Sequence, residues 1–147
     1  MKVVTVVGAR PQFVKAAVLR RLFQENNIKE VLVHTGQHYS DNMDRVFFQE
    51  LGLAEPDYRF DVNNAGHGRM VGRMVEAVST VLADEMPDWV LVYGDTNTSL
   101  AGALAAKILG LKLAWTSLTN HGGATSTPSS TSSWTSSMDQ GIRHCFV

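Results

Sequence analysis

The chain has 147 residues, with 13 Lys and Arg against 14 Asp and Glu, and 44% of its residues are hydrophobic. This length suits one globular domain with a hydrophobic core and is too short for two. A net charge of −1 argues against nucleic acid or a membrane surface as a partner, and no apolar run is long enough to span a bilayer. A single cysteine, Cys145, excludes a disulfide framework and a multi-cysteine zinc site. We therefore expect a cytoplasmic location.

The composition changes near residue 115. Residues 1–114 contain 3 Ser and 5 Thr, whereas residues 115–147 contain 8 Ser and 6 Thr, with only Asp139 and Arg143 charged. Neither a helical nor a strand periodicity continues into this second part. We expect a folded domain over residues 1–114 and a low-complexity, disordered Ser/Thr-rich tail over residues 115–147.

Apolar β-branched runs that end at glycine or a polar residue alternate with segments of helical periodicity. The predicted strands are Val3–Val7, Glu30–Thr35, Tyr58–Val62 (the weakest), Trp89–Tyr93 and Leu111–Ala114. The predicted helices follow Pro11, run from Ser40 to Leu51, cover Met70–Leu82 and cover Leu100–Leu109. This alternation predicts an α/β fold, a Rossmann-like doubly wound parallel sheet with helices on both faces. Ligands bind such sheets where the carboxyl ends of strands turn into helices.

The first of these turns is Gly8–Gln12, with Lys15 following on the predicted helix. A helix N-terminus offers backbone donors to an anion, and Arg10 and Lys15 would add positive charge. The spacing matches neither a dinucleotide glycine motif nor a Walker loop, so it indicates an anion site without naming the nucleotide. The alternative is an ordinary surface helix, with an exposed Arg10 and with the aliphatic part of Lys15 lying along the surface while its charged end reaches water.

The second turn contains His38, whose side chain can exchange a proton near neutral pH. The alternative is an exposed or hydrogen-bonded turn residue. We expect His34, within the strand, to be structural. No two histidines have the spacing of metal ligands, so we expect no metal site.

The third turn, Gly94–Thr98, contains Asp95. A carboxylate at a strand end faces the binding crevice and can serve as an acid or a base there. The alternative, which the position taken alone favours, is that Asp95 is the N-cap of the next helix.

Taken together, the three turns resemble the non-hydrolysing UDP-N-acetylglucosamine 2-epimerases. The similarity covers residues 1 to about 114, and four linked motifs are more specific than any one of them. The family usually has Glu where this chain has Gln12. The matching motifs are Gly8-Ala9-Arg10-Pro11-Gln12 with Lys15, Thr35-Gly36-Gln37-His38, Pro87-Asp88-Trp89-Val90-Leu91-Val92 and Gly94-Asp95-Thr96.

The resemblance implies one half of a two-domain, glycosyltransferase-B-like architecture with a UDP-sugar in the cleft. It implies interconversion of UDP-GlcNAc and UDP-ManNAc, through elimination and re-addition of UDP, without a cofactor. Arg10 would contact the diphosphate, Lys15 would support that charged pocket, His38 would line the cleft, and Asp95 would be one of the acid/base carboxylates. The full-length family member is expected to be a homodimer.

The resemblance ends after the last predicted strand, where Ser117 stands in place of a catalytic Glu of the family. The family's second domain has no counterpart in the tail, so we expect this chain alone to be inactive. A shifted reading frame would produce such a break. That hypothesis is contradicted if no other frame of the coding DNA encodes the family's His-Val-Glu-Ala-Gly motif at this point. The alternatives are a nucleotide- or anion-binding module without catalysis, a non-functional fragment that associates through its exposed cleft face, and a relative with another UDP-sugar or a hydrolysing reaction.

Overall fold

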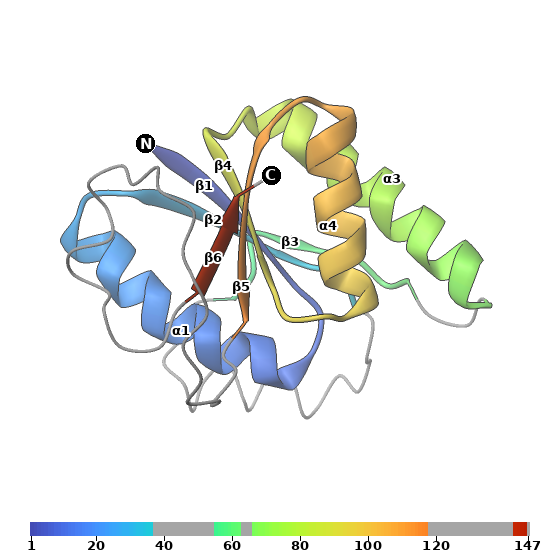
Figure 1. Ribbon diagram of the computed structural model, residues 1–147, viewed down its shortest axis with the longest axis horizontal. Helices are drawn as coiled ribbons and strands as arrows, with labels where there is room; N and C mark the ends of the chain where they lie inside the picture. Colours follow the sequence, from blue (N-terminus) through green and yellow to red (C-terminus); the bar gives the residue numbers. More distant parts are fainter. Residues whose placement is uncertain (37–54, 63–65, 118–142, 147) are drawn as a thin grey trace.

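A six-stranded sheet forms the centre of the protein (Figure 1). The computed structural model describes residues 1–36, 55–62, 66–117 and 143–146. The strand order is β3-β2-β1-β4-β5-β6, and neighbouring strands are parallel except β5 and β6. The strands are β1 (Lys2–Val7), β2 (Lys29–His34), β3 (Tyr58–Arg59), β4 (Trp89–Tyr93), β5 (Lys112–Ser117) and β6 (Arg143–Phe146).

Helices cover both faces of this sheet. Helix α1 (Arg10–Glu25) lies on one face, and α3 (His67–Glu85) and α4 (Asn97–Ile108) lie side by side on the other (Figure 1). Each connects two parallel strands, which requires a crossover over one face of the sheet. The chain reverses its direction of winding between β1 and β4, because α1 leads away from β1 to one side and α4 leads away from β4 to the other.

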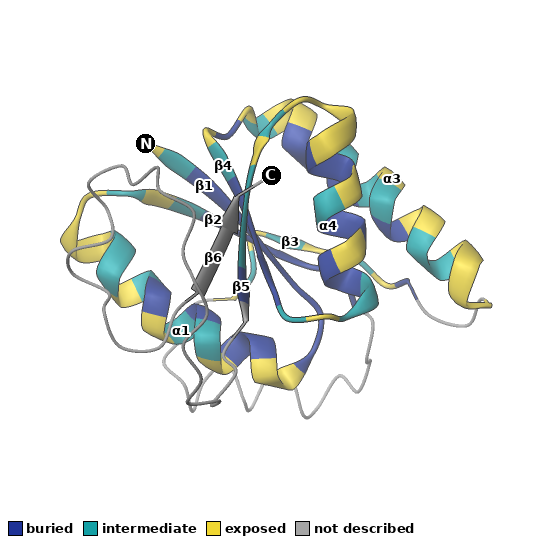
Figure 2. Ribbon diagram, viewed as in Figure 1, coloured by how far each residue is buried: buried dark blue, intermediate teal, exposed yellow. Residues whose placement is uncertain are grey.

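The central strand explains why the sheet needs both layers. In β1, Val4 and Val6 are fully buried in the core beneath α3 and α4, whereas Val3 and Val7 contribute to the core beneath α1. Successive side chains of a strand point to opposite faces, so a continuous run of valines makes both faces apolar. The buried strands form the dark interior in Figure 2.

The predicted fold class, a Rossmann-like parallel sheet with helices on both faces, is confirmed. Element boundaries differ: β3 has two residues instead of the predicted five, and α4 begins at Asn97 rather than Leu100. The earlier start has a local cause, because the Thr96 side chain caps the helix by accepting a hydrogen bond from the backbone N–H of Ser99. The helix predicted from Ser40 to Leu51 lies outside the described residues.

Two segments of the predicted tail form strands. Strand β5 continues through Ser117 instead of ending at Ala114, and its residues Trp115 and Thr116 pair with Val92 and Tyr93 of β4. Strand β6 then pairs with β5 in the antiparallel direction. Residues 115–117 and 143–146 of the predicted tail are thus strand residues, and residues 118–142 lie outside the described part of the chain. Backbone pairing with a buried neighbouring strand outweighs a composition that by itself carries no periodicity.

Candidate functional site

The first and third predicted turns flank the point where the sheet changes its direction of winding. Strands β1, β2 and β4 are adjacent and parallel, so the turns that follow them emerge at one edge of the sheet. The backbone N–H of Thr35, after β2, donates to the carbonyl of Val7 at 2.9 Å. Binding sites of doubly wound sheets occur at such a point.

A pair of buried hydroxyls joins the turns below their surface. Thr35 Oγ1 and Thr98 Oγ1 are 2.8 Å apart, and both residues are fully buried. Gly8 lies against this pair, and a Cβ atom at Gly8 would overlap both hydroxyl oxygens. Glycine is therefore required here by the close approach of α4 to the end of β1.

Gln12 connects the first turn to the third. Its Oε1 accepts hydrogen bonds from the backbone N–H groups of Gly8 at 2.7 Å and Ala9 at 3.1 Å. Its Nε2 donates to the carbonyl of Tyr93 at 2.7 Å and to Thr96 Oγ1 at 2.8 Å. Gln12 is only 3% exposed, so these contacts lie inside the protein. The backbone donors of Gly8 and Ala9 are consequently occupied by a side chain of the protein itself.

The two cations of the first turn lie at the surface. Arg10 is the first residue of α1 and is exposed, while Lys15, one turn further along the helix, is half-buried. Because Gln12 occupies the N–H groups of Gly8 and Ala9, an anion at this turn would be held chiefly by these two side chains. Arginine presents a planar fork that matches phosphate oxygens, and lysine presents a point charge.

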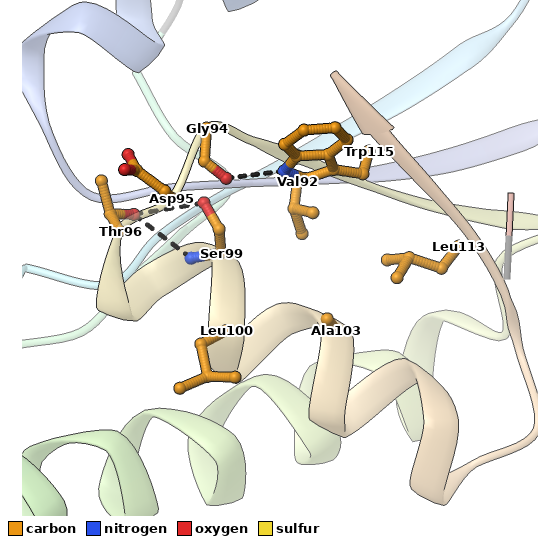
Figure 3. Close-up of a pocket in the computed structure, with 9 residues that line it drawn as sticks. All are labelled: Val92, Gly94, Asp95, Thr96, Ser99, Leu100, Ala103, Leu113 and Trp115. Carbon is orange, nitrogen blue, oxygen red and sulfur yellow. Dashed lines mark hydrogen bonds between the residues drawn. The ribbon is translucent and has the colours of Figure 1, made fainter. Parts of the chain in front are cut away.

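Asp95 is free of the capping role that its position alone suggested. Thr96 is the N-cap residue of α4, and Asp95 precedes it as an exposed residue. Gly94 has a φ of +67°, a left-handed conformation that favours glycine and turns the chain sharply after β4. In Figure 3 the Asp95 carboxylate points away from Trp115. Asp95 is therefore available to a ligand outside the sheet edge.

A pocket of about 550 Å³ lies beside this turn, between α4 and the ends of β4 and β5 (Figure 3). Asp95, Thr96 and Ser99 supply its polar groups, and Leu113 and Trp115 form part of its apolar wall. Trp115 Nε1 donates to the carbonyl of Gly94 at 2.6 Å, which ties the indole to the third turn. A wall of this kind suits a ligand with a ring and a few polar groups.

Of the two histidines at or after the end of β2, His34 and His38, the structure describes only His34. His34 is buried and stacks on Phe13 with ring centroids 5.2 Å apart, in agreement with the structural role expected from the sequence. Burial lowers the pKa of His34 to about 4, and the positive charge of Arg59 adds to this effect. His38 lies outside the described residues.

The described part of the chain holds no cluster of three or more His, Cys, Asp or Glu residues arranged to bind a metal ion. It also holds no helix that is both long enough and apolar enough to cross a membrane.

Three residues of the site were not assigned to it from the sequence. From the sequence, Gln12 is only the end of the first turn and a departure from the family pattern, Thr98 is only the end of the third turn, and Trp115 belongs to the tail. For Gln12 a signal existed, because a long side chain with both donor and acceptor atoms lies in the first turn of a helix that follows a glycine. The burial of Thr98 and the pairing of Trp115 depend on strands and helices distant in sequence.

Comparisons with known proteins agree on one family. A family model described as UDP-N-acetylglucosamine 2-epimerase matches residues 20–117. UDP-2,3-diacetamido-2,3-dideoxy-D-glucuronate 2-epimerase of Pseudomonas aeruginosa is 48% identical over 115 residues, which are 78% of this chain and 32% of that protein.

Solved structures support the same relationship. UDP-GlcNAc 2-epimerase of Methanocaldococcus jannaschii, in complex with UDP-GlcNAc and UDP, has a TM-score of 0.74 at 43% identity and is matched over 78% of this chain and 32% of its own. The Streptomyces sp. SF2575 glycosyltransferase SsfS6 has a TM-score of 0.57 at 18% identity, covering 80% of this chain and 39% of its own, a likeness of fold alone.

The chain spans about a third of the length of the epimerases that it matches. The residues matched by the family model include β2, β4, α4 and β5, and so the turn between β4 and α4. The chain belongs to the UDP-N-acetylglucosamine 2-epimerase family.

Proposed function

We propose that this chain supplies the N-terminal part of a UDP-sugar 2-epimerase, with UDP-GlcNAc as the substrate and UDP-ManNAc as the product. The observation that supports the proposal is that Gln12 joins the turn before Arg10 to the turn that contains Asp95, with Lys15 further along α1. A diphosphate needs positive charge, and a proton transfer at carbon 2 of the sugar needs a carboxylate nearby. Both groups lie at the end of the sheet where doubly wound folds bind ligands.

The proposed reaction is an elimination followed by an addition. A base removes the proton at C2 of the sugar, the C1–O bond breaks, and its electron pair leaves with UDP, so that a C1=C2 double bond forms. UDP then adds back at C1 while a proton is delivered to the opposite face of C2. Arg10 and Lys15 would stabilise the charge that grows on the departing diphosphate. Asp95 would serve one of the two proton transfers.

Proton transfer to opposite faces of C2 requires groups on both sides of the sugar. Ser117, at the end of β5, occupies the position that the resemblance gives to a second carboxylate. A serine hydroxyl does not replace a carboxylate base without a further group to accept its proton. We therefore propose that this chain by itself binds the nucleotide sugar without converting it. His38 would line the same cleft.

A second candidate differs in the sugar. The relative from Pseudomonas aeruginosa is named for a diacetamido sugar acid rather than for UDP-GlcNAc. Both names describe a UDP-sugar that is epimerised at C2, so the diphosphate site and Asp95 would serve either substrate. The sugar's further substituents would be recognised elsewhere.

We also propose a homodimer in a cytoplasmic setting. Three exposed apolar residues, Leu100, Leu104 and Ile108, recur at intervals of four along α4. This spacing places them on one face of the helix, and such an apolar stripe favours association with another protein surface. A single cysteine fits a reducing compartment.

Binding of UDP and UDP-GlcNAc to the purified chain, measured by calorimetry, tests the proposed function. We expect binding that Arg10→Ala and Lys15→Ala each weaken about ten- to a hundredfold, since each removes a charge-assisted contact. Arg21→Ala, an exposed cation further along α1, is the control and should leave the affinity unchanged.

Turnover is followed in the same samples by proton NMR in D2O, where reaction at C2 replaces its proton with deuterium. We expect no exchange with this chain. Exchange would contradict the inactivity that we propose, and absence of binding to either nucleotide would contradict the proposed function itself.

A further inference from the structure

We infer that Gln12 is a positioning residue: its side-chain amide holds the turn that carries Asp95 against the turn that carries Arg10, so that the two turns form one rigid unit. Nothing in the sequence required this, because Gln12 and Thr96 are 84 positions apart. The bridge itself follows from the contacts of the side chain, whereas its consequence for ligand binding rests on the proposed function.

The partners of Gln12 determine the orientation of its amide group. Backbone N–H groups of Gly8 and Ala9 can only donate, so the atom facing them must be the oxygen. The carbonyl of Tyr93 can only accept, so the atom facing it must be the nitrogen. One side chain thus satisfies the acceptor and donor needs of two separate turns.

The amide has a complete set of partners. Nε2 carries two hydrogens, and its two short contacts, to the Tyr93 carbonyl and Thr96 Oγ1, use both. Ser99 Oγ is further away at 3.3 Å, and its hydroxyl donates to the same Tyr93 carbonyl. At 3% exposure Gln12 is shielded from water, so breaking any of these bonds leaves a buried polar group without a partner.

The bridge acts on the residues of the proposed site through their neighbours. Thr96 follows Asp95 directly, and Tyr93 lies two residues before it, so Gln12 holds the chain on both sides of Asp95. On the other side, Gly8 and Ala9 precede Arg10. Gln12 itself is buried and touches neither charged group in these bonds. Its role is therefore to fix the distance between the cation and the carboxylate.

Two substitutions separate hydrogen bonding from the filling of space. Gln12→Met keeps the length and approximate volume of the side chain but removes both its donor and its acceptor. Gln12→Glu keeps the acceptor for Gly8 and Ala9, but its second oxygen would face the carbonyl of Tyr93, which can only accept. We expect Gln12→Glu to keep the contacts with the first turn and to lose the one with Tyr93, whereas Gln12→Met should lose both. Gln24→Met, at an exposed position of the same helix, is the control.

Amide hydrogen exchange followed by NMR is the primary measurement. In Gln12→Met, we expect the exchange rates at Gly8, Ala9, Asp95 and Thr96 to increase about tenfold more than the rates at the amides of β2. The β2 amides report global opening of the protein. In Gln12→Glu, exchange should be faster at Asp95 and Thr96 but unchanged at Gly8 and Ala9, and Gln24→Met should match the original protein. The inference is overturned if Gln12→Met exchanges like the original protein at these amides, or if Gln12→Glu changes all four amides as Gln12→Met does.

Nucleotide affinity gives a second readout that a space-filling role would not change. UDP can reach only the diphosphate part of the proposed site, whereas UDP-GlcNAc also reaches Asp95. Loss of the bridge in Gln12→Met should therefore weaken UDP-GlcNAc more than UDP, by severalfold, whereas Gln24→Met should leave the ratio unchanged. Equal weakening of both would contradict the positioning role. If the original protein binds neither, the proposed function fails, and the exchange rates alone decide whether the bridge exists.

Discussion

At the scale of single residues, the site depends on Gly8, which has no Cβ atom. Gly8 approaches Thr35 and Thr98 so closely that any Cβ atom would overlap their hydroxyls. These hydroxyls are hydrogen-bonded to each other and buried. A side chain at Gly8 would have to separate α4 from the end of β1, and that would disturb both turns of the site.

Replacing Gly8 with alanine should therefore lower the free energy of unfolding by about 1–3 kcal/mol, the usual cost of overpacking a buried site. Gly72→Ala is the matched control, because Gly72 lies inside α3 with open space around it. That change should stabilise the protein by about 0.5–1 kcal/mol through helix propensity. Urea unfolding of both variants checks this. An unaltered midpoint for Gly8→Ala would contradict the close approach.

His34 makes the free energy of unfolding depend on pH. Its pKa is about 4 in the folded protein because burial, and then Arg59, disfavour its charged form, whereas an unfolded histidine titrates near 6.5. Below pH 6.5 the unfolded state therefore binds a proton that the folded state excludes. The stabilisation is complete above pH 6.5 and is lost as the pH falls towards 4.

We expect the free energy of unfolding to decrease by about 3 kcal/mol between pH 6.5 and pH 4 through His34. The variant His34→Leu should lose this part of the pH dependence, while His67→Leu, at an exposed position in α3, should keep it. Urea midpoints at four pH values in this interval provide the measurement. Parallel curves for the original protein and His34→Leu would show that the pKa assignment is wrong.

At the scale of elements, α4 has two different faces. Its inner face contains Gly102, where a Cβ atom would lie 2.7 Å from Val92 Cγ1, so the helix packs directly on β4. Its outer face carries the apolar stripe Leu100, Leu104 and Ile108, exposed by 52%, 42% and 69%. Charged or polar residues would be expected on a helix face that meets only water.

If α4 forms the proposed dimer contact, a charge in the stripe should disrupt it. We expect Leu104→Lys to shift the chain from dimer to monomer in light scattering after size exclusion, because an unpaired charge would be buried between the subunits. Val18→Lys, at a 60% exposed apolar position of α1, should leave the dimer intact. A monomeric original protein, or dissociation by Val18→Lys alone, would contradict the assignment to α4.

At the scale of the whole molecule, the site lies where the sheet reverses its winding. The turns after β1 and β4 diverge there, one towards α1 and the other towards the opposite face, and ligands bind doubly wound sheets at such a point. Gln12 joins these two turns by hydrogen bonds. Strand β5 contributes Trp115 to the pocket beside the β4 turn, and this residue lies just beyond the predicted end of the strand at Ala114.

Much of this could be predicted from the sequence because the information was local. The valines of β1, the glycines after β1 and β4, and the spacing of apolar residues in α3 each determine an element through its own residues. The site was partly predictable for the same reason, since Arg10, Lys15 and Asp95 lie in turns with recognisable sequences. The role of Thr96 as N-cap was missed because Asp95, its neighbour, has an equal preference for that position.

The sequence by itself determined the order of the described strands and helices from β1 to β5, the two-sided burial of the sheet, and the family. Only the tertiary structure decided which groups are joined. Gln12 meets Tyr93 and Thr96, Thr35 meets Thr98, and the end of β5 completes the pocket, all across more than 20 residues of chain. Hydrogen bonds between buried groups depend on where packing brings distant turns together, and no local pattern of residue types records that position.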